Sequence, residues 1–287
     1  MTVTSLHNIN FGKQLFLQKA LPRRLHKMNF SSLFGVLLGV GVMVASLAES
    51  GMDLMFFLNF HGIVIVCGGT LAAASISFPI KKIISLLKIF FFRVLGKNKV
   101  NYQESVQTLL DLNKKASLGL SALKDSIPSI RHPFLKEGVS LVAAGVLTEQ
   151  EIRSVLEERL KTVEKKYMSE ANMFKSIGKF PPAFGLLATT LGMIALLQQL
   201  GKPGSEKLIG PAMSIGLVGT LYGISIANLV FLPIAENLTE RTEEEIALRR
   251  MMVEGAILLK KQVNPLAMKE SLNSFLMPEE RIERRVA

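Results

Sequence analysis

Four long apolar segments, none of them interrupted by Asp, Glu, Lys or Arg in its apolar core, constrain this chain most. They lie at about residues 32–47, 56–78, 182–200 and 211–234. A helix needs about 20 apolar residues to cross a bilayer, and a charge at mid-bilayer is costly. The sequence therefore predicts an all-α membrane protein with four transmembrane helices.

The distribution of basic residues indicates how these helices are oriented. Lysines and arginines crowd before the first segment and after the second, whereas the link between these two segments has neither. By the positive-inside rule, both termini and the long middle section are cytoplasmic. This pattern explains the net charge of +11 as a feature of a membrane protein. A nucleic-acid-binding function is disfavoured, because aromatic residues, at 7% of the chain, offer little surface for stacking bases.

The chain divides into five predicted parts. Residues 1–27 are basic and lack a long apolar core, which argues against a cleavable signal peptide; they form either an interfacial tail or an extension before a true start at Met28, which we favour. The other parts are transmembrane helices 1–2 in 28–79, a cytoplasmic helical domain in 80–180, transmembrane helices 3–4 in 181–235 and cytoplasmic C-terminal helices in 236–287.

One long helix is predicted within the middle section. Thr148 and Glu151 form a capping-box signature at its start. Apolar residues then recur at steps of three and four, which predicts one buried stripe: Ile152, Leu156, Leu160, Val163, Tyr167, Ala171 and Phe174. A second long helix continues from the last apolar segment and ends before Asn264-Pro265.

Residues for enzymatic chemistry are missing from the sequence. The single cysteine, Cys67, can form no intramolecular disulfide, and the four histidines have no partners at ligand spacing. Nucleophile-elbow and phosphate-binding glycine motifs are also lacking. We expect a protein that is not an enzyme and has no cofactor.

Polar residues within the apolar segments are candidates for an ion pathway. Thr189 and Thr190 in the third segment and Thr220 in the fourth offer hydroxyl oxygens, which hard cations prefer as ligands. The ordinary alternative is a hydrogen bond to the helix's own carbonyl four residues earlier. Pro182 and Pro233, near the cytoplasmic ends of these segments, are either helix boundaries or hinges.

Small residues occupy one face of each apolar segment and allow close helix packing. This packing is either within a four-helix unit or against another subunit. The residues are Gly35 and Gly39; Gly69, Ala73 and Ser77; Gly185, Thr189 and Gly192; Gly216, Thr220, Gly223 and Ala227.

Several motifs together resemble the flagellar-motor stator A subunit, the MotA/PomA family. They are GGTL at 68–71 leading to SFP at 77–79, PAFG at 182–185, GTLYG at 219–223, ANLVFLP at 227–233, MVEGA at 252–256 and NP at 264–265. The resemblance extends over about residues 28–281.

The resemblance implies a homo-pentamer of A subunits around two B subunits in the bacterial inner membrane. The MotB/PomB-like B subunit anchors to peptidoglycan and supplies a membrane aspartate, and H⁺ or Na⁺ flow past it turns the A ring against a FliG-like rotor switch protein. In the family, positions matching Pro182 and Pro233 couple ion flow to movement. Positions matching Thr189 and Thr220 line the ion path, and threonine at both resembles the sodium-driven branch.

The rotor-facing segment departs from the family pattern. The family has an arginine three residues before a glycine and a glutamate five after it. With that glycine aligned to Gly119, Ala116 and Lys124 stand at these positions. The nearby charges that compensate are expected to be Lys114, Lys115 and Asp125, with Lys124 itself; ordinary solvent-exposed charge is the alternative.

Three other functions compete with this reading. An ExbB/TolQ-like energiser also couples ion flow to work, but it typically has three spans and an external N-terminus. A self-sufficient channel needs an ionisable or carbonyl-lined path within the spans. The third alternative is a passive membrane scaffold, against which the threonines and prolines argue only mildly.

Overall fold

The computed structural model describes residues 28–49, 57–90, 101–204 and 206–281, in which every regular element is a helix. These residues form two compact units. One, the α10–α11 unit, comprises the described residues of 26–98 and 167–240. The other, the α6–α8 unit, comprises those of 99–166 and 241–287.

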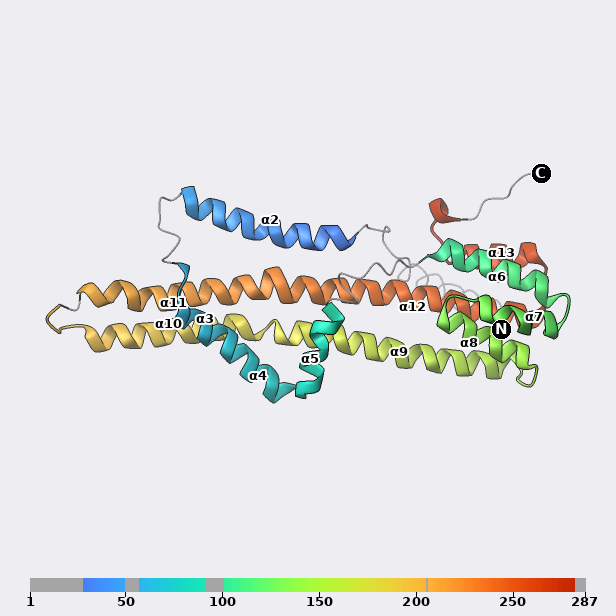
Figure 1. Cartoon of the computed structure of the whole chain (residues 1–287), viewed down its shortest axis with the longest axis horizontal. Coiled ribbons are helices and arrows are strands. Elements are labelled where there is room, and N and C mark those ends of the chain that lie inside the picture. Colours follow the sequence, from blue (N-terminus) through green and yellow to red (C-terminus); the bar gives the residue numbers. More distant parts are fainter. Residues whose placement is uncertain (1–27, 50–56, 91–100, 205, 282–287) are drawn as a thin grey trace, which may run out of the picture. The chain divides into compact units, whose positions relative to one another are not determined.

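The α10–α11 unit contains all four predicted apolar segments (Figure 1). The first is α2 (Met28–Glu49), and the second is divided into α3 (Phe60–Ile63), the π-helical η2 (Val64–Gly68) and α4 (Gly69–Ser77). The third is α10 (Phe180–Gln199), which runs beside α11 (Glu206–Ile226). Among the described residues, three helical stretches are long and apolar enough to cross a membrane: 60–77, 149–199 and 209–261.

A second π-helical segment, η5 (Ala227–Phe231), joins α11 to α12 (Leu232–Lys261) without a break in the helix. Pro233 is the second residue of α12. Because proline lacks an N–H, it cannot complete the hydrogen bond to the carbonyl four residues earlier, and a π turn is one way to accommodate this. Pro233 therefore lies inside a continuous helix, whereas Pro182 lies in the first turn of α10.

The short helix α5 (Ile80–Ile89) follows α4 after two residues. Leu86 of α5 is buried in a small apolar core with Phe174 and Ile177 at the end of α9 (Glu149–Ile177) and Leu238 of α12. Ile83, Ile89 and Phe90 pack on this core. One side of α5 is therefore fixed by apolar contacts within the unit.

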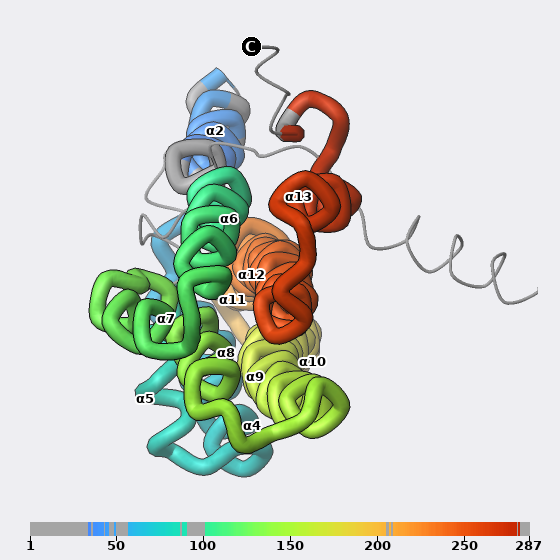
Figure 2. Tube along the Cα trace, turned by 90° about the vertical axis from the view of Figure 1, so that its right-hand side faces the viewer, coloured from blue at the N-terminus to red at the C-terminus, as the bar shows by residue number. Residues whose placement is uncertain are grey.

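The α6–α8 unit packs α6 (Tyr102–Ala116), α7 (Leu120–Ser126), η4 (Ile127–Ser129), α8 (Pro133–Ala144) and α13 (Pro265–Asn273) with parts of α9 and α12. The turn η6 (Pro278–Glu280) follows α13. In Figure 2, α13 lies beside α6, which agrees with their contacts. The largest fully buried side chains include Leu109, Ile152, Leu156 and Met251.

The predicted ends of the two long helices are confirmed. The Thr148 N–H donates to Glu151 Oε2 at 2.8 Å, and the Glu151 N–H donates to Thr148 Oγ1 at 3.3 Å, so the capping box starts α9. Ile152 and Leu156 have no exposed surface, as the predicted stripe requires. The preceding helix α12 ends at Lys261, and Asn264 starts α13 by accepting the Leu266 N–H at 2.9 Å.

Candidate functional site

Two of the three candidate threonines meet between α10 and α11. Thr189 Oγ1 and Thr220 Oγ1 lie 2.6 Å apart, and both side chains are half-buried. Thr189 Oγ1 also lies 3.0 Å from the Gly216 carbonyl oxygen and 3.2 Å from that of Gly185. Thr220 Oγ1 lies 3.1 Å from the same Gly185 carbonyl. Four oxygens, two hydroxyl and two carbonyl, are thus gathered at one point.

The acceptor capacity of this cluster is not exhausted, although its two donor protons cannot serve all four oxygen–oxygen contacts at once. Two hydroxyl groups carry two protons, and each hydroxyl oxygen has two acceptor lone pairs. The cluster combines the bond to the helix's own carbonyl, which sequence reasoning considered ordinary, with bonds across the two helices. Oxygen ligands in this number and of this type suit a hard cation or a hydrogen-bonded water.

Glycines bring the two helix backbones close enough for these bonds. A Cβ atom on Gly185 would lie 3.0 Å from Thr220 Cα, and one on Gly216 would lie 2.9 Å from Thr189 Cα. A Cβ on Gly192 would lie 2.7 Å from the Ala212 carbonyl oxygen. These small residues therefore pack α10 against α11 within the chain. By contrast, a Cβ on Gly35 of α2 would meet no atom within 4 Å.

Thr190 does not join this cluster. Its side chain is exposed, and its hydroxyl donates to the Leu186 carbonyl at 3.0 Å, four residues earlier in α10. Adjacent helix residues point about 100° apart, so only one of two successive threonines can face α11. Thr190 is therefore a matched comparison for Thr189 on the same helix.

The two prolines lie in different surroundings. A Cβ on Gly223 of α11 would lie 3.1 Å from Pro182 Cα, so the first turn of α10 packs directly on α11. Pro233 is exposed, two residues after η5 ends. Pro182 is thus in contact with the helix that carries Thr220, whereas Pro233 follows a widened helical turn.

Tyr222 forms a polar contact that sequence reasoning missed. Its hydroxyl donates to the Phe57 carbonyl and accepts the Asn59 N–H at 3.3 Å. Asn59 also caps α3, since its Oδ1 accepts the Gly62 N–H at 3.0 Å. These contacts tie α11 to the start of the second predicted span. A tyrosine in an apolar segment was the available signal, because its hydroxyl needs a partner when it leaves water.

The candidate rotor-facing charges lie at the ends of two helices of the α6–α8 unit. Lys114 and Lys115 are in the last turn of α6, Lys124 and Asp125 are near the end of α7, and all four are exposed. Lys114 Nζ pairs with Asp111 Oδ1 at 3.3 Å. Ala116 is only 3% exposed and belongs to the apolar core of the unit, so this position presents no side chain to a partner.

Exposed apolar residues accompany these charges. Leu118 and Val146 are 80% and 84% exposed, and Leu120 is 44% exposed. The turn that carries Leu118 and Leu120 contains Gly119, whose φ of +117° is accessible to glycine and rarely to other residues. A Cβ on Gly145 would lie 3.2 Å from Leu120, so the turns at 117–120 and 145–147 are neighbours.

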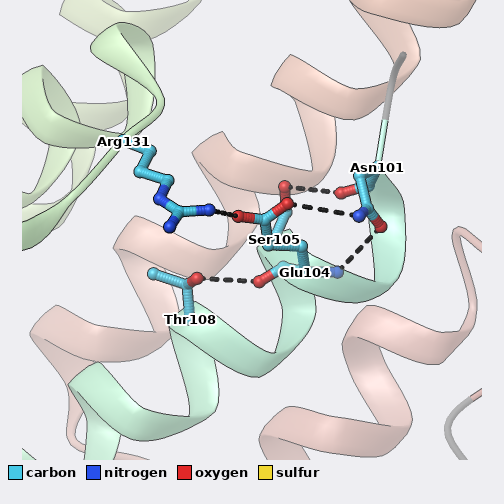
Figure 3. Close-up of polar contacts among 5 residues, drawn as sticks. All are labelled: Asn101, Glu104, Ser105, Thr108 and Arg131. Carbon is cyan, nitrogen blue, oxygen red and sulfur yellow. Dashed lines mark hydrogen bonds and ion pairs between the residues drawn. The ribbon is translucent and has the colours of Figure 1, made fainter.

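Polar contacts fix the other end of α6 (Figure 3). The Glu104 N–H donates to Asn101 Oδ1 at 3.1 Å, which caps the helix. Arg131 Nη1, from the segment before α8, contacts Glu104 Oε1 at 3.1 Å. Both side chains are largely exposed, so the ion pair orients the segment more than it stabilises it.

A partly buried charge pair of α12 lies against α8. The Arg249 guanidinium, whose side chain is only 11% exposed, contacts Glu245 at 2.5 Å and lies 5.5 Å from the centre of the Phe134 ring. Burial, and then the positive charge of Arg249, lower the pKa of His132, while Glu245 partly opposes this effect. Within the described residues, His, Cys, Asp and Glu form no cluster of three or more that could hold a metal ion.

Comparisons with known proteins agree with this architecture. Residues 126–251 match the MotA/TolQ/ExbB proton channel family. The chain is 33% identical over 258 residues to Motility protein A of Borreliella burgdorferi, with 88% of this chain and 96% of that protein covered. It is 35% identical to the uncharacterized protein YtxD of Bacillus subtilis, with 88% and 93% covered.

Solved structures show the same fold. The flagellar MotAB stator complex from Bacillus subtilis matches with a TM-score of 0.79 and 26% identity, covering 88% of this chain and 98% of the other. The similarity to the motility protein of B. burgdorferi extends over almost the whole of both sequences. This chain therefore belongs to the motility protein A family, a family of membrane ion-channel subunits and not of enzymes.

Proposed function

We propose that this chain is the A-type stator subunit of an ion-driven flagellar motor and is a multi-pass protein of the bacterial inner membrane. The observation that carries the proposal is the oxygen cluster of Thr189 and Thr220 in a pair of helices that lack Asp, Glu, Lys and Arg in their apolar cores. Such helices can line an ion path but cannot themselves bind a proton on a carboxylate.

A B-type subunit would supply the missing carboxylate. The relative of known structure from B. subtilis is a MotAB complex, which supports a MotB-like partner for this chain. Exposed apolar side chains on α10, including Leu186, Leu187 and Leu191, offer surface for a partner helix or lipid. An assembly of five A subunits around two B subunits follows from the family resemblance.

The central experiment is complementation of a strain that lacks its stator genes. This chain with its B-type partner should restore swimming, whereas either protein alone should not. Expressed alone, the chain should leave membrane potential and internal pH undisturbed, because its spans lack an ion-binding carboxylate. A robust ion leak from the purified chain in liposomes would favour a self-sufficient channel. Failure to restore swimming, combined with support of an outer-membrane transport system, would favour an ExbB/TolQ-like energiser.

The proposal includes four transmembrane helices, with both termini and the α6–α8 unit in the cytoplasm. Support comes from the lysine and arginine asymmetry and from α2, whose 22 residues are long enough to span a bilayer. Cysteines placed at Ser50 and Ser205 in a Cys67-free background should react with an impermeant reagent outside intact cells. A cysteine at Gln150 should react only after the cells are opened. Labelling of Gln150 in intact cells would contradict this orientation.

Sodium is the proposed coupling ion. A sodium ion must shed part of its water shell in a narrow path, and the two hydroxyl and two carbonyl oxygens at Thr189 and Thr220 would lower that cost. Swimming speed should rise with external sodium at fixed pH, and Thr220→Ala should weaken this dependence. The matched control is Thr190→Ala, which removes a hydroxyl bonded only to its own helix. Motility that ignores sodium and collapses with a protonophore would mean that the motor uses protons.

The turn between α6 and α7 is the proposed contact with a FliG-like rotor protein. This region exposes two apolar side chains, Leu118 and Val146, and two basic ones, Lys115 and Lys124. Such a surface suits a partner with an apolar pocket and acidic side chains. Lys124→Glu should impair swimming without reducing the amount of membrane-inserted protein. Ion flow is coupled to rotation near Pro182 and Pro233, so Pro182→Ala should permit assembly and impair rotation.

A further inference from the structure

One face of α5 is exposed and combines apolar and basic side chains. Ile80 and Ile84 are 65% and 57% exposed, and Lys81 and Lys88 are also exposed. Residues three, four and seven apart lie on one side of a helix, which places Lys81, Ile84 and Lys88 in one row with Ile80 beside them. A helix on the surface of a globular protein normally turns such isoleucines toward the core.

The opposite face of α5 is already occupied. Leu86 is 6% exposed and packs in the core with Phe174, Ile177 and Leu238. Because this side is buried within the unit, α5 cannot rotate to hide Ile80 and Ile84 without exposing Leu86. The exposure of the two isoleucines is therefore a fixed property of this unit, and they must be covered by lipid or by another molecule.

The charge on this helix has one sign. Residues 80–89 contain three lysines and no acidic residue, and the following residues add Arg93, Lys97 and Lys99. Among the described residues, none of the carboxylates forms an ion pair with Lys81, Lys82 or Lys88. The face therefore carries uncompensated positive charge and suits an anionic partner.

The position of α5 in the chain indicates which partner this is. The helix begins three residues after α4 ends, and the stretch 60–77 is apolar and long enough to cross a membrane. Ile76, in the last turn of α4, is 88% exposed. A helix that directly follows a membrane span starts at the boundary between hydrocarbon and headgroups, where isoleucines enter the acyl region and lysines extend to the headgroup phosphates.

We propose that the Ile80–Lys81–Ile84–Lys88 face of α5 is a binding site for anionic phospholipids of the adjacent leaflet. Lys81 and Lys88 bind the headgroup phosphate, and Ile80 and Ile84 contact the upper acyl chains. Bound lipid would hold α5, and through Leu86 the core shared with α9 and α12, at the membrane surface. This proposal goes beyond the stator function, because lipid selectivity is measured without a partner or torque.

The test measures which lipids contact the full chain in a bilayer. The chain is reconstituted into phosphatidylcholine vesicles with trace spin-labelled phosphatidylglycerol or spin-labelled phosphatidylcholine, and the motionally restricted fraction of each probe is compared. The unmodified protein should prefer phosphatidylglycerol, and the preference should fall with added salt. Lys81→Gln/Lys88→Gln should reduce the preference by about fivefold for each lysine removed, which is the contribution of one lysine near an anionic surface.

Matched variants separate a site from general attraction. Lys202→Gln/Lys207→Gln removes the same charge beside the other end of α10 and α11 and should leave the preference nearly unchanged. Lys81→Arg/Lys88→Arg keeps the charge and should preserve it. Absence of any preference in the unmodified protein, or an equal loss in both glutamine variants, overturns the proposal. If the first glutamine variant does not insert, a preference in the unmodified protein that is insensitive to salt overturns it.

Discussion

Replacing Gly192 with alanine tests whether close packing of α10 on α11 holds the threonine hydroxyls together. The new Cβ would lie 2.7 Å from the Ala212 carbonyl oxygen and 3.1 Å from the Gly216 N. Both contacts are backbone atoms, so no side chain can rotate away. The shorter distance is about 0.7 Å below the 3.4 Å at which ordinary contacts begin, so the helices must separate locally by about that amount.

The cost of this separation follows from packing energetics. A gap of about 0.5–1 Å removes about a quarter to a half of the attraction of each contact, and overpacking typically costs about 1–3 kcal/mol. Alanine has a higher helix propensity than glycine by about 1 kcal/mol, which partly offsets the loss. Gly210→Ala in α11 measures this propensity gain alone, because its Cβ would have no atom within 4 Å. The difference between the two variants is therefore the cost of the close contact.

The assay is unfolding of the purified full chain in mixed micelles, together with swimming of complemented cells. We expect Gly192→Ala to be less stable than Gly210→Ala by about 1–3 kcal/mol. Swimming should also be slower, because a wider helix spacing lengthens the 2.6 Å contact between Thr189 and Thr220. Equal stability of the two variants would refute the inference that these backbones are in close contact.

Three further predictions concern the α6–α8 unit. Thr148→Ala should lower the free energy of unfolding by about 1 kcal/mol and speed amide exchange in the first turn of α9. Hydrogen bonds from Thr148 lower the Glu151 pKa, so the capping box should also weaken in acid, when Glu151 is protonated. Arg249→Leu should destabilise the chain by about 1–3 kcal/mol because Glu245 loses its partner, and adding Glu245→Leu should recover part of the loss in the same unfolding assay. The pKa of His132 is lower in the folded protein than in the unfolded chain, so neutral His132 contributes stability above about pH 6.5 that is lost as pH falls. In His132→Gln, the unfolding midpoint should therefore change less between about pH 7 and pH 5 than in the unmodified protein.

The local features of this protein could be predicted from the sequence. The capping box at Thr148, the stripe containing Ile152 and Leu156 and the cap at Asn264 depend on residues within one or two helical turns. The apolar segments likewise follow from composition over about 20 residues. Family motifs, such as the glycines around Thr220, are also local and can be read from the sequence.

Contacts between segments needed the tertiary structure. The spacing of small residues already set Thr189, and not Thr190, on one face with Gly185 and Gly192, but only the docking of α11 shows that Thr189 meets Thr220. The π turn before Pro233 depends on how a continuous helix accommodates a missing N–H, whereas the sequence allowed a boundary or a hinge. The exposure of Ile84 likewise follows from the burial of Leu86 on the opposite face. Periodicity shows which residues share a face, but the face that is buried depends on which distant helix packs against it.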